Sequence, residues 1–246
     1  MINLMNQLQI FQDELQKILE ELKTSPEGYL GKRGKYYYHV IGTKEIGITN
    51  KFLTIRQLCR KKYLHARQKQ IEYNLNLKPK NFDKFDHRTP RELIKSFPKA
   101  YQGFSLSYFY HPSIETWLKE PYEKHPYPPE EGYTTKSGVQ VRSKSELMIA
   151  TQLENYQIPY RYEAMLRVGN KKECPDFTIK SPFTAKTINW EHLGALHLAD
   201  YIKKMNEKMD AYLAHGYKLN DTLIYTFEFQ IKNINRIQKI IEEIIL

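Results

Sequence analysis

Three carboxylates in the second half of the chain have the types and settings that a divalent-metal site needs. Glu146 follows Ser143-Lys144-Ser145, Asp176 follows Pro175, and Glu191 lies in the string Trp190-Glu191-His192-Leu193-Gly194. A hard cation such as Mg²⁺ takes oxygen ligands, keeps most of its waters and gains its remaining ligands from a substrate phosphate. Two or three convergent carboxylates are therefore enough, and the chemistry they indicate is metal-assisted hydrolysis of a phosphodiester.

Regular elements must hold these acids in place. The apolar run after Glu146 predicts a helix that Ser143 or Ser145 can cap, so the carboxylate would lie near a helix N-terminus. Asp176 and Glu191 belong to β-favouring runs. The expected order is helix 143–156, strand 159–168, a turn at Gly169-Asn170, strand 174–179, strand 187–193, helix 198–214, strand 222–228 and helix 231–245. This alternation predicts an α/β fold with a mixed sheet flanked by helices.

The helix with its Glu, the β-hairpin, the Pro-Asp pair and the strand ending in Glu together resemble the PD-(D/E)XK nuclease superfamily, over roughly residues 130–246. The resemblance implies a restriction-endonuclease-like fold and a metal-dependent endonuclease that hydrolyses DNA with Mg²⁺ or Mn²⁺. It also implies that Asp176 and Glu191 are metal ligands and that Glu146 completes the catalytic site.

The chain departs from that family at the lysine. Leu193 stands two residues after the second acid, where the family pattern has Lys, and leucine cannot polarise a water. The next helix carries Tyr201, Lys204, Lys208 and Tyr212 at steps of three and four, hence on one face. A lysine displaced to this helix is known in the superfamily, and the string around Glu191 with its Tyr/Lys helix resembles a bacterial subset of it. Lys208 is the favoured replacement and Lys204 the second, because either flexible stem can reach back.

Other interpretations of these residues remain open. A Glu early in a helix often only complements the helix dipole, and an Asp after Pro is commonly part of a turn. Strand alternation points His192 away from Glu191, which argues against a ligand role. Glu163 either orients the site or forms an ordinary ion pair. The missing lysine motivates the alternative of a catalytically inactive nucleic-acid-binding or assembly protein that keeps the nuclease fold.

The composition suits a nucleic-acid partner. The net charge is +10, which attracts polyanions and makes association salt-dependent, and 19 tyrosines accompany the basic residues. Tyrosines in Lys35-Tyr36-Tyr37-Tyr38 and Lys62-Tyr63 are candidates for stacking on bases, although an AT-rich coding bias also enriches Lys and Tyr. The residues expected to contact nucleic acid near the acids are Lys136, Arg142, Lys144, Tyr201 and Tyr212.

Two cysteines, Cys59 and Cys174, lie far apart without metal-ligand spacing, so neither a disulfide framework nor a zinc site is indicated. No apolar stretch approaches the ~20 residues that cross a bilayer, and polar residues interrupt the N-terminus where a signal peptide needs an apolar core. The sequence thus predicts a cytoplasmic protein without a membrane partner.

Three parts are expected along the chain. Residues 1–77 form a helix, a basic β-hairpin and a second helix, for assembly or nucleic-acid binding; residues 78–137 form an irregular, proline- and aromatic-rich arm that packs on the core; residues 138–246 form the nuclease-like domain. The first helix has a heptad seam that packs on its own chain, forms a homodimer through a coiled coil or docks a partner protein. Its members are Leu4, Leu8, Phe11, Leu15, Ile18 and Leu22.

Overall fold

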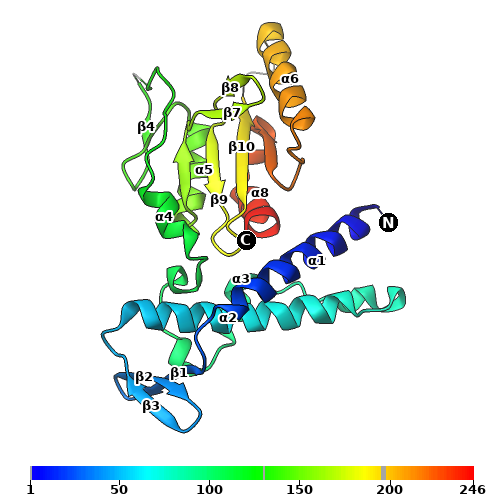
Figure 1. Cartoon of the computed structure of the whole chain (residues 1–246). Helices are drawn as coiled ribbons and strands as arrows, with labels where there is room; N and C mark the ends of the chain where they lie inside the picture. The colour runs from blue at the N-terminus through cyan, green and yellow to red at the C-terminus, as the bar shows by residue number, and fades with distance from the viewer. Residues whose placement is uncertain (1, 130, 195–197) are drawn as a thin grey trace. The chain divides into compact units, whose positions relative to one another are not determined.

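A computed structural model describes residues 2–129, 131–194 and 198–246 of the 246-residue chain (Figure 1). The chain forms two compact units, Met1–His111 and Pro112–Leu246. The expected arm at 78–137 is therefore shared between the units. Within the described residues, no helix combines the length and the apolar character required to cross a bilayer.

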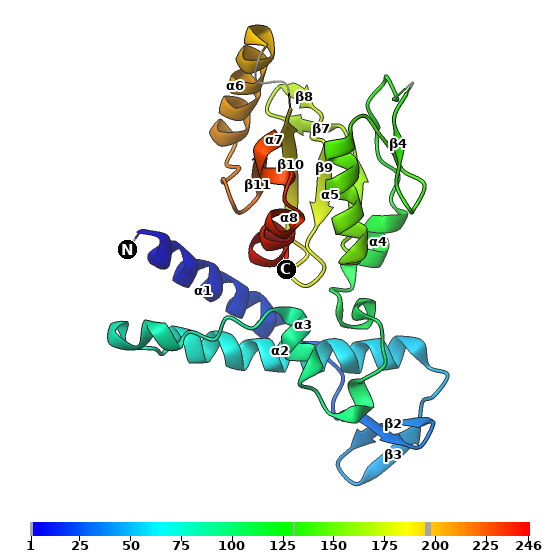
Figure 2. The same ribbon diagram turned by 180° about the vertical axis from the view of Figure 1, so that it is seen from behind.

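Two helices form the frame of the first unit. The helix α1 (Ile2–Lys23) packs antiparallel to α2 (Phe52–Leu75), as Figure 2 shows. Phe11 and Ile18 of the heptad seam are buried, whereas the side chain of Leu4 lies outside the described part of the chain. Ion pairs join Glu14 to Arg67 at 2.7 Å and Glu21 to Arg60 at 2.8 Å. Of the three uses considered for the seam, the structure shows packing on its own chain.

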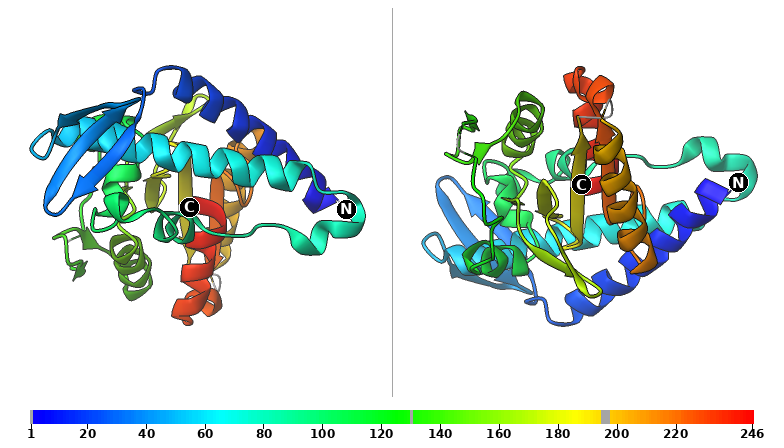
Figure 3. Two further views of the ribbon diagram at one scale, coloured as in Figure 1. Left: turned by 90° about the horizontal axis from the view of Figure 1, so that it is seen from below. Right: turned by 90° about the horizontal axis from the view of Figure 1, so that it is seen from above.

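A small antiparallel sheet follows α1 and adjoins the N-terminal end of α2 (Figure 3). Its strands run in chain order, β1 (Tyr29–Arg33), β2 (Tyr36–Ile41) and β3 (Lys44–Gly47), so the expected hairpin gains a third strand. One face is covered by the segment that contains η2 (Lys99–Tyr101) and η3 (Leu106–Phe109). There the Leu30 N–H donates to the Tyr101 hydroxyl at 3.1 Å, and the Tyr37 ring lies 5.1 Å from that of Phe104.

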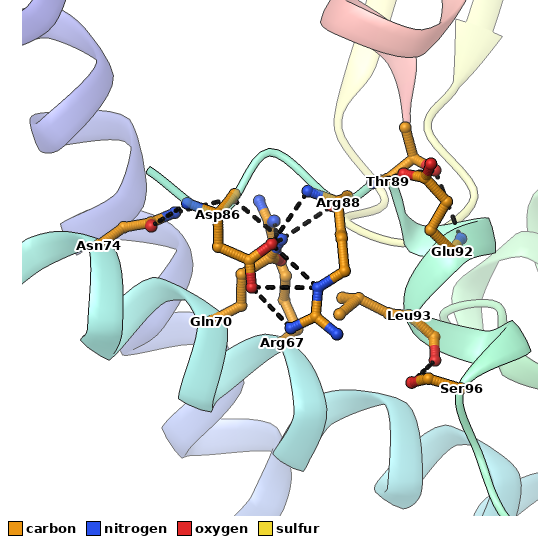
Figure 4. Close-up of polar contacts among 9 residues, drawn as sticks. All are labelled: Arg67, Gln70, Asn74, Asp86, Arg88, Thr89, Glu92, Leu93 and Ser96. Atoms are coloured by element: carbon orange, nitrogen blue, oxygen red, sulfur yellow. Dashed lines mark hydrogen bonds and ion pairs between the residues drawn. The ribbon is translucent and has the colours of Figure 1, made fainter. Parts of the chain in front are cut away.

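Buried amides of α2 hold the segment between η1 (Pro79–Lys84) and α3 (Pro90–Lys95) (Figure 4). Asn74 accepts from the Asp86 N–H at 2.8 Å and donates to the Asp86 carbonyl at 3.0 Å. Gln70 donates to the Arg88 carbonyl at 2.8 Å, while the Arg88 guanidinium donates to the Asp86 carboxylate at 2.6 Å. These contacts satisfy backbone groups that an irregular segment would otherwise leave unpaired.

The ion pair between Arg88 and Asp86 makes the stability of the first unit depend on pH. The Arg88 guanidinium lowers the pKa of Asp86 to about 2, below the ~3.9 of an unfolded aspartate. A lowered folded pKa contributes stability above the unfolded pKa, and that contribution is lost as pH falls through about 2. Asp86→Asn is therefore expected to lower the free energy of unfolding by about 1 kcal/mol at about pH 5, and by progressively less toward about pH 2. The loss at about pH 5 is small because water screens the half-exposed Arg88. Denaturant unfolding of both proteins between about pH 2 and about pH 5 tests this prediction. A difference in the free energy of unfolding that does not change with pH would contradict it.

The second unit is built around a four-stranded sheet with the order β11-β10-β9-β6. Only β10 and β11 are parallel, with α6 as the crossover between them; the other neighbours are antiparallel. Figure 2 shows α5, α7 and α8 over one face, where the main core lies. The elements are α4 (Ser113–Lys119), β4 (Tyr133–Thr134), β5 (Gln140–Val141), α5 (Lys144–Asn155), β6 (Tyr160–Tyr162), β7 (Leu166–Val168), β8 (Lys171–Glu173), β9 (Phe177–Lys180), β10 (Thr187–Leu193), α6 (Ala199–Ala214), β11 (Leu223–Phe227), α7 (Glu228–Ile231), α8 (Ile234–Ile240) and a final π-helical turn η4 (Ile241–Ile245).

Two expected elements are interrupted. The strand expected at 159–168 divides into β6 and β7 at Glu163, whose φ is +45° and whose N–H donates to the Asp176 carbonyl at 3.0 Å. The expected turn at Gly169-Asn170 joins β7 to β8. The expected C-terminal helix is likewise broken, because the Asn233 side chain accepts from the Asn235 N–H and caps a new helix, α8.

Candidate functional site

Asp176 directly precedes β9 in the second unit, and Glu191 lies in the neighbouring strand β10. Phe177 of β9 pairs with Trp190 of β10, so Asp176 stands opposite Glu191 one step beyond the last paired residues. Asp176 is partly buried, and its Oδ2 accepts from the His192 N–H at 2.5 Å. Burial raises the pKa of Asp176 well above its usual value, and the neighbouring charge of Glu191 raises it further. Two acids forced together in this way favour a bound cation.

Helix α6 supplies a cation to Glu191. The buried Glu191 carboxylate lies 2.7 Å from the Lys208 ammonium, which also donates to the Cys174 carbonyl at 2.7 Å. Burial raises the pKa of Glu191, while the Lys208 charge and the hydrogen bonds from Lys208 and Tyr212 oppose that rise. Lys204 is exposed one turn earlier on the same helix. The structure thus brings Lys208, and not Lys204, to the acids.

The expectation that Tyr212 contacts nucleic acid is wrong. Tyr212 is fully buried, packs with Val168 and Leu223, and donates its hydroxyl to Glu191 at 3.0 Å. Helical spacing correctly placed it beside Lys208, but spacing does not reveal how deeply a side chain is buried. Its role is to hold the Glu191 carboxylate.

Glu146 lies beside the acid pair, at the start of α5. The Ser143 hydroxyl caps this helix by accepting from the Glu146 N–H at 3.1 Å. The Glu146 carboxylate accepts from the Tyr162 hydroxyl at 2.6 Å and from the Arg142 N–H at 2.8 Å. Its charge also contributes to the raised pKa of Asp176. The three predicted acids therefore act on one another electrostatically.

Tyr225 is a site residue that the sequence did not single out. It pairs with Glu191 across the parallel strands, and its buried hydroxyl has no hydrogen-bond partner among the described residues. Burial, followed by the charge of Glu191, raises the pKa of this phenol. A buried unpaired hydroxyl marks a place for a water or a ligand oxygen. Alternation along strand 222–228 would have revealed Tyr225 only once the pairing of β10 with β11 was known.

The carboxylate oxygens of Asp176, Glu191 and Glu146 are ligands of the kind that a hard divalent cation prefers. Side-chain oxygens dominate the site, as Mg²⁺ and Mn²⁺ prefer, and the Asp176–Glu191 pair carries charge that burial makes costly. Asp176 and Glu191 would hold the cation, with Glu146 adjacent. Among the described residues no group of three His, Cys, Asp or Glu side chains is close enough to hold a metal ion by itself. Mg²⁺ ordinarily keeps several waters and takes further ligands from a substrate phosphate.

Tyr225→Phe tests whether this hydroxyl faces the reacting groups. Removing an unpaired buried hydroxyl is expected to raise the free energy of unfolding by about 1 kcal/mol. If the hydroxyl donates to a substrate or water oxygen, the metal-dependent phosphodiester cleavage expected from the sequence should fall roughly tenfold or more. Thermal unfolding and plasmid cleavage measure the two effects, with the half-exposed Tyr133→Phe as the control. Unchanged cleavage would exclude Tyr225 from the chemistry.

His192 points to the opposite side of β10 from Glu191, as strand alternation predicted. Its Nδ1 lies 3.2 Å from the Thr226 hydroxyl and its Nε2 lies 3.2 Å from the Glu228 carboxylate. The Ser145 hydroxyl donates to the same carboxylate at 2.9 Å. This network ties β10 to α5 and to the end of β11, and it holds the strand whose backbone N–H donates to Asp176.

The remaining residues expected at nucleic acid differ in their surroundings. Lys136 and Lys144 are exposed, whereas Arg142 forms an ion pair with Glu163 at 2.6 Å. Of the two roles considered for Glu163, the structure shows the ion pair. Tyr201 is partly buried, and burial, followed by the charges of Asp176 and Glu191, raises the pKa of its hydroxyl.

Comparisons with protein-family models, with curated proteins and with solved structures found no match for this chain.

Proposed function

We propose that this chain is a metal-dependent endonuclease of the PD-(D/E)XK type that hydrolyses phosphodiester bonds in DNA with Mg²⁺ or Mn²⁺. One observation carries the proposal: Asp176, directly before β9, stands opposite Glu191 of β10, and Lys208 of the following helix lies 2.7 Å from Glu191. The order α5, β6, β9, β10, α6, β11 supports it, because a restriction-endonuclease-like core places its acids on the corresponding helix and strands.

Each residue of the site would have a different role in hydrolysis. A divalent cation held by Asp176 and Glu191 would neutralise the phosphate and lower the pKa of the attacking water. Tyr212 and Lys208 keep the Glu191 carboxylate oriented and favour its ionised form. Lys208, about a quarter exposed, can also stabilise the charge that develops on the phosphoryl oxygens. Glu146 adds negative charge beside Asp176, which strengthens the preference of the site for a cation.

A binding or assembly protein without turnover is the second candidate. Leu193 favours it, because the position that carries the family's lysine is filled here by an apolar side chain that is only 4% exposed. In this alternative Lys208 would serve only to compensate the buried charge of Glu191, which would be costly if left unpaired.

Cleavage assays separate the two candidates. The protein is incubated with supercoiled plasmid, linear duplex, single-stranded DNA and RNA, in Mg²⁺, in Mn²⁺ and in EDTA. Metal-dependent cleavage of DNA supports the endonuclease, and cleavage of RNA alone would correct its substrate. No cleavage of any substrate, with salt-sensitive binding retained, would favour the binding protein.

A further inference from the structure

The positive charge of the chain lies in only one of its two units. Residues 1–111 contain 20 Lys and Arg against 10 Asp and Glu, whereas residues 112–246 contain 18 of each. The entire net charge of +10 therefore belongs to the first unit, and the unit with the candidate site is neutral overall. The net long-range attraction of the chain to a polyanion therefore comes from the first unit.

One face of the β1–β3 sheet carries aromatic rings in the open. The pairing of Arg33 with Tyr36 and of Gly31 with Tyr38 places Arg33, Tyr36 and Tyr38 on the same face, together with Tyr29 by alternation. We call this set the tyrosine face. Tyr29 is 57% exposed and Tyr36 is 52% exposed, although the opposite face of the same sheet is packed against the unit.

The neighbours of Tyr38 leave room beside its ring. Tyr38 pairs with Gly31 on one side and with Gly47 on the other, so neither adjacent strand raises a side chain next to it. A Cβ added at Gly47 would meet no atom within 4 Å, whereas one added at Gly31 would meet the Val40 side chain at 2.9 Å, so the open space lies on the Gly47 side of the ring. The Tyr38 ring is partly exposed, and the side toward Gly47 is of the kind on which a base stacks.

Cations accompany the rings. The Lys35 ammonium lies 5.5 Å from the centre of the Tyr36 ring, and the Arg33 guanidinium lies 5.9 Å from that of Tyr38. Arg33 also pairs with Glu45 at 2.7 Å, but its side chain remains 72% exposed. Phosphates that flank a stacked base would therefore meet positive charge directly beside each ring.

We propose that the tyrosine face binds single-stranded nucleic acid, with bases stacked on Tyr36 and Tyr38 and phosphates next to Arg33 and Lys35. Side chains at alternate positions of a strand lie roughly 7 Å apart, which leaves space for one base on each ring. Unpaired bases offer both of their faces, whereas the bases of a duplex are stacked inside it. This binding rests on the first unit alone and holds whether or not the second unit cleaves.

Binding is measured on the full chain in EDTA, where metal-dependent cleavage cannot occur. The probes are fluorescently labelled oligomers of about 12 nucleotides: oligo-dT, oligo-rU and a matched duplex. Binding is measured from the change in their fluorescence anisotropy. Tyr36→Ala with Tyr38→Ala is expected to weaken single-strand binding roughly 25-fold or more, because each stacked ring contributes at least about fivefold. Phe at both positions should retain binding, since the rings remain and the sheet face is preserved.

Matched controls distinguish stacking from charge and from misfolding. Tyr73→Ala removes a ring of similar exposure from α2 and should bind as the unchanged protein does. Lys35→Ala should reduce the dependence of binding on salt. Wild-type binding by the double alanine variant would overturn the proposal, as would equal affinity for the duplex or an equal loss with the Phe variant. Retained binding without any cleavage would instead contradict only the proposed endonuclease.

Discussion

If the proposed endonuclease activity is present, Asp176→Asn is expected to reduce metal-dependent cleavage by roughly 10³-fold or more, because it removes a proposed metal ligand from the acid pair. The asparagine oxygen can still accept from the His192 N–H, so the strand contact of 2.5 Å is preserved. Initial rates of plasmid nicking in Mg²⁺ provide the measurement. Binding of single strands in EDTA should not change, because the tyrosine face lies in the other unit.

The same substitution is expected to stabilise the protein in the absence of metal. A carboxyl group with a raised folded pKa stabilises the fold below its unfolded pKa, and this contribution is lost as pH rises through the folded pKa. Above the unfolded pKa, the buried Asp176 carboxyl next to Glu191 therefore costs stability relative to a neutral side chain. Replacing it with neutral Asn should raise the unfolding temperature in EDTA, and Mg²⁺ should stabilise the variant less than the unchanged protein.

Loss of activity together with a gain in stability is characteristic of a site built for function. A structural ion-pair network would behave in the opposite way, since breaking it would lower stability. An Asp176→Asn protein that is both active and less stable would exclude Asp176 as a metal ligand. Asp200→Asn on exposed α6 is a control for the loss of one negative charge.

Much of the second unit could be predicted because its pattern is local. Strand 187–193 and the helix at 198–214 have the expected bounds to within a residue, since a buried apolar run and a helical period determine them. The break at Glu163 could not be predicted in this way. Glu163 has a positive φ, and its N–H donates to the Asp176 carbonyl. This hydrogen bond joins two segments that a local sequence pattern does not relate to each other.

The sequence indicated the acidic residues of the candidate site, but it indicated the lysine and tyrosine residues less well. Lys204 and Lys208 lie one turn apart on the same helical face, so periodicity favours both, and only the position of α6 against β10 separates them. Tyr225 was missed because its neighbour, Glu191, comes from a strand brought alongside by the crossover. Residues that depend on sheet order are therefore beyond the reach of local sequence patterns.

Lys208→Met is the second substitution with a large expected effect. Among the described residues it leaves the buried Glu191 with Tyr212 as its side-chain donor, and an uncompensated buried charge is costly. Because Lys208 is about a quarter exposed, we expect a loss of about 2 kcal/mol in the free energy of unfolding in EDTA. Mg²⁺ should restore part of that loss, since a cation at Glu191 offsets the same charge.

Cleavage by Lys208→Met should fall by roughly 10²- to 10³-fold even in saturating Mg²⁺, because the metal replaces the lysine as a partner of Glu191 but not at the phosphoryl oxygens. Lys204→Met is the matched control: it removes the same charge one turn away on the same helix, from an exposed position. It should cleave at nearly the unchanged rate. Equal losses in the two variants would mean that the helix contributes only general positive charge, whereas a loss confined to Lys208 would identify the lysine that replaces the one missing at Leu193.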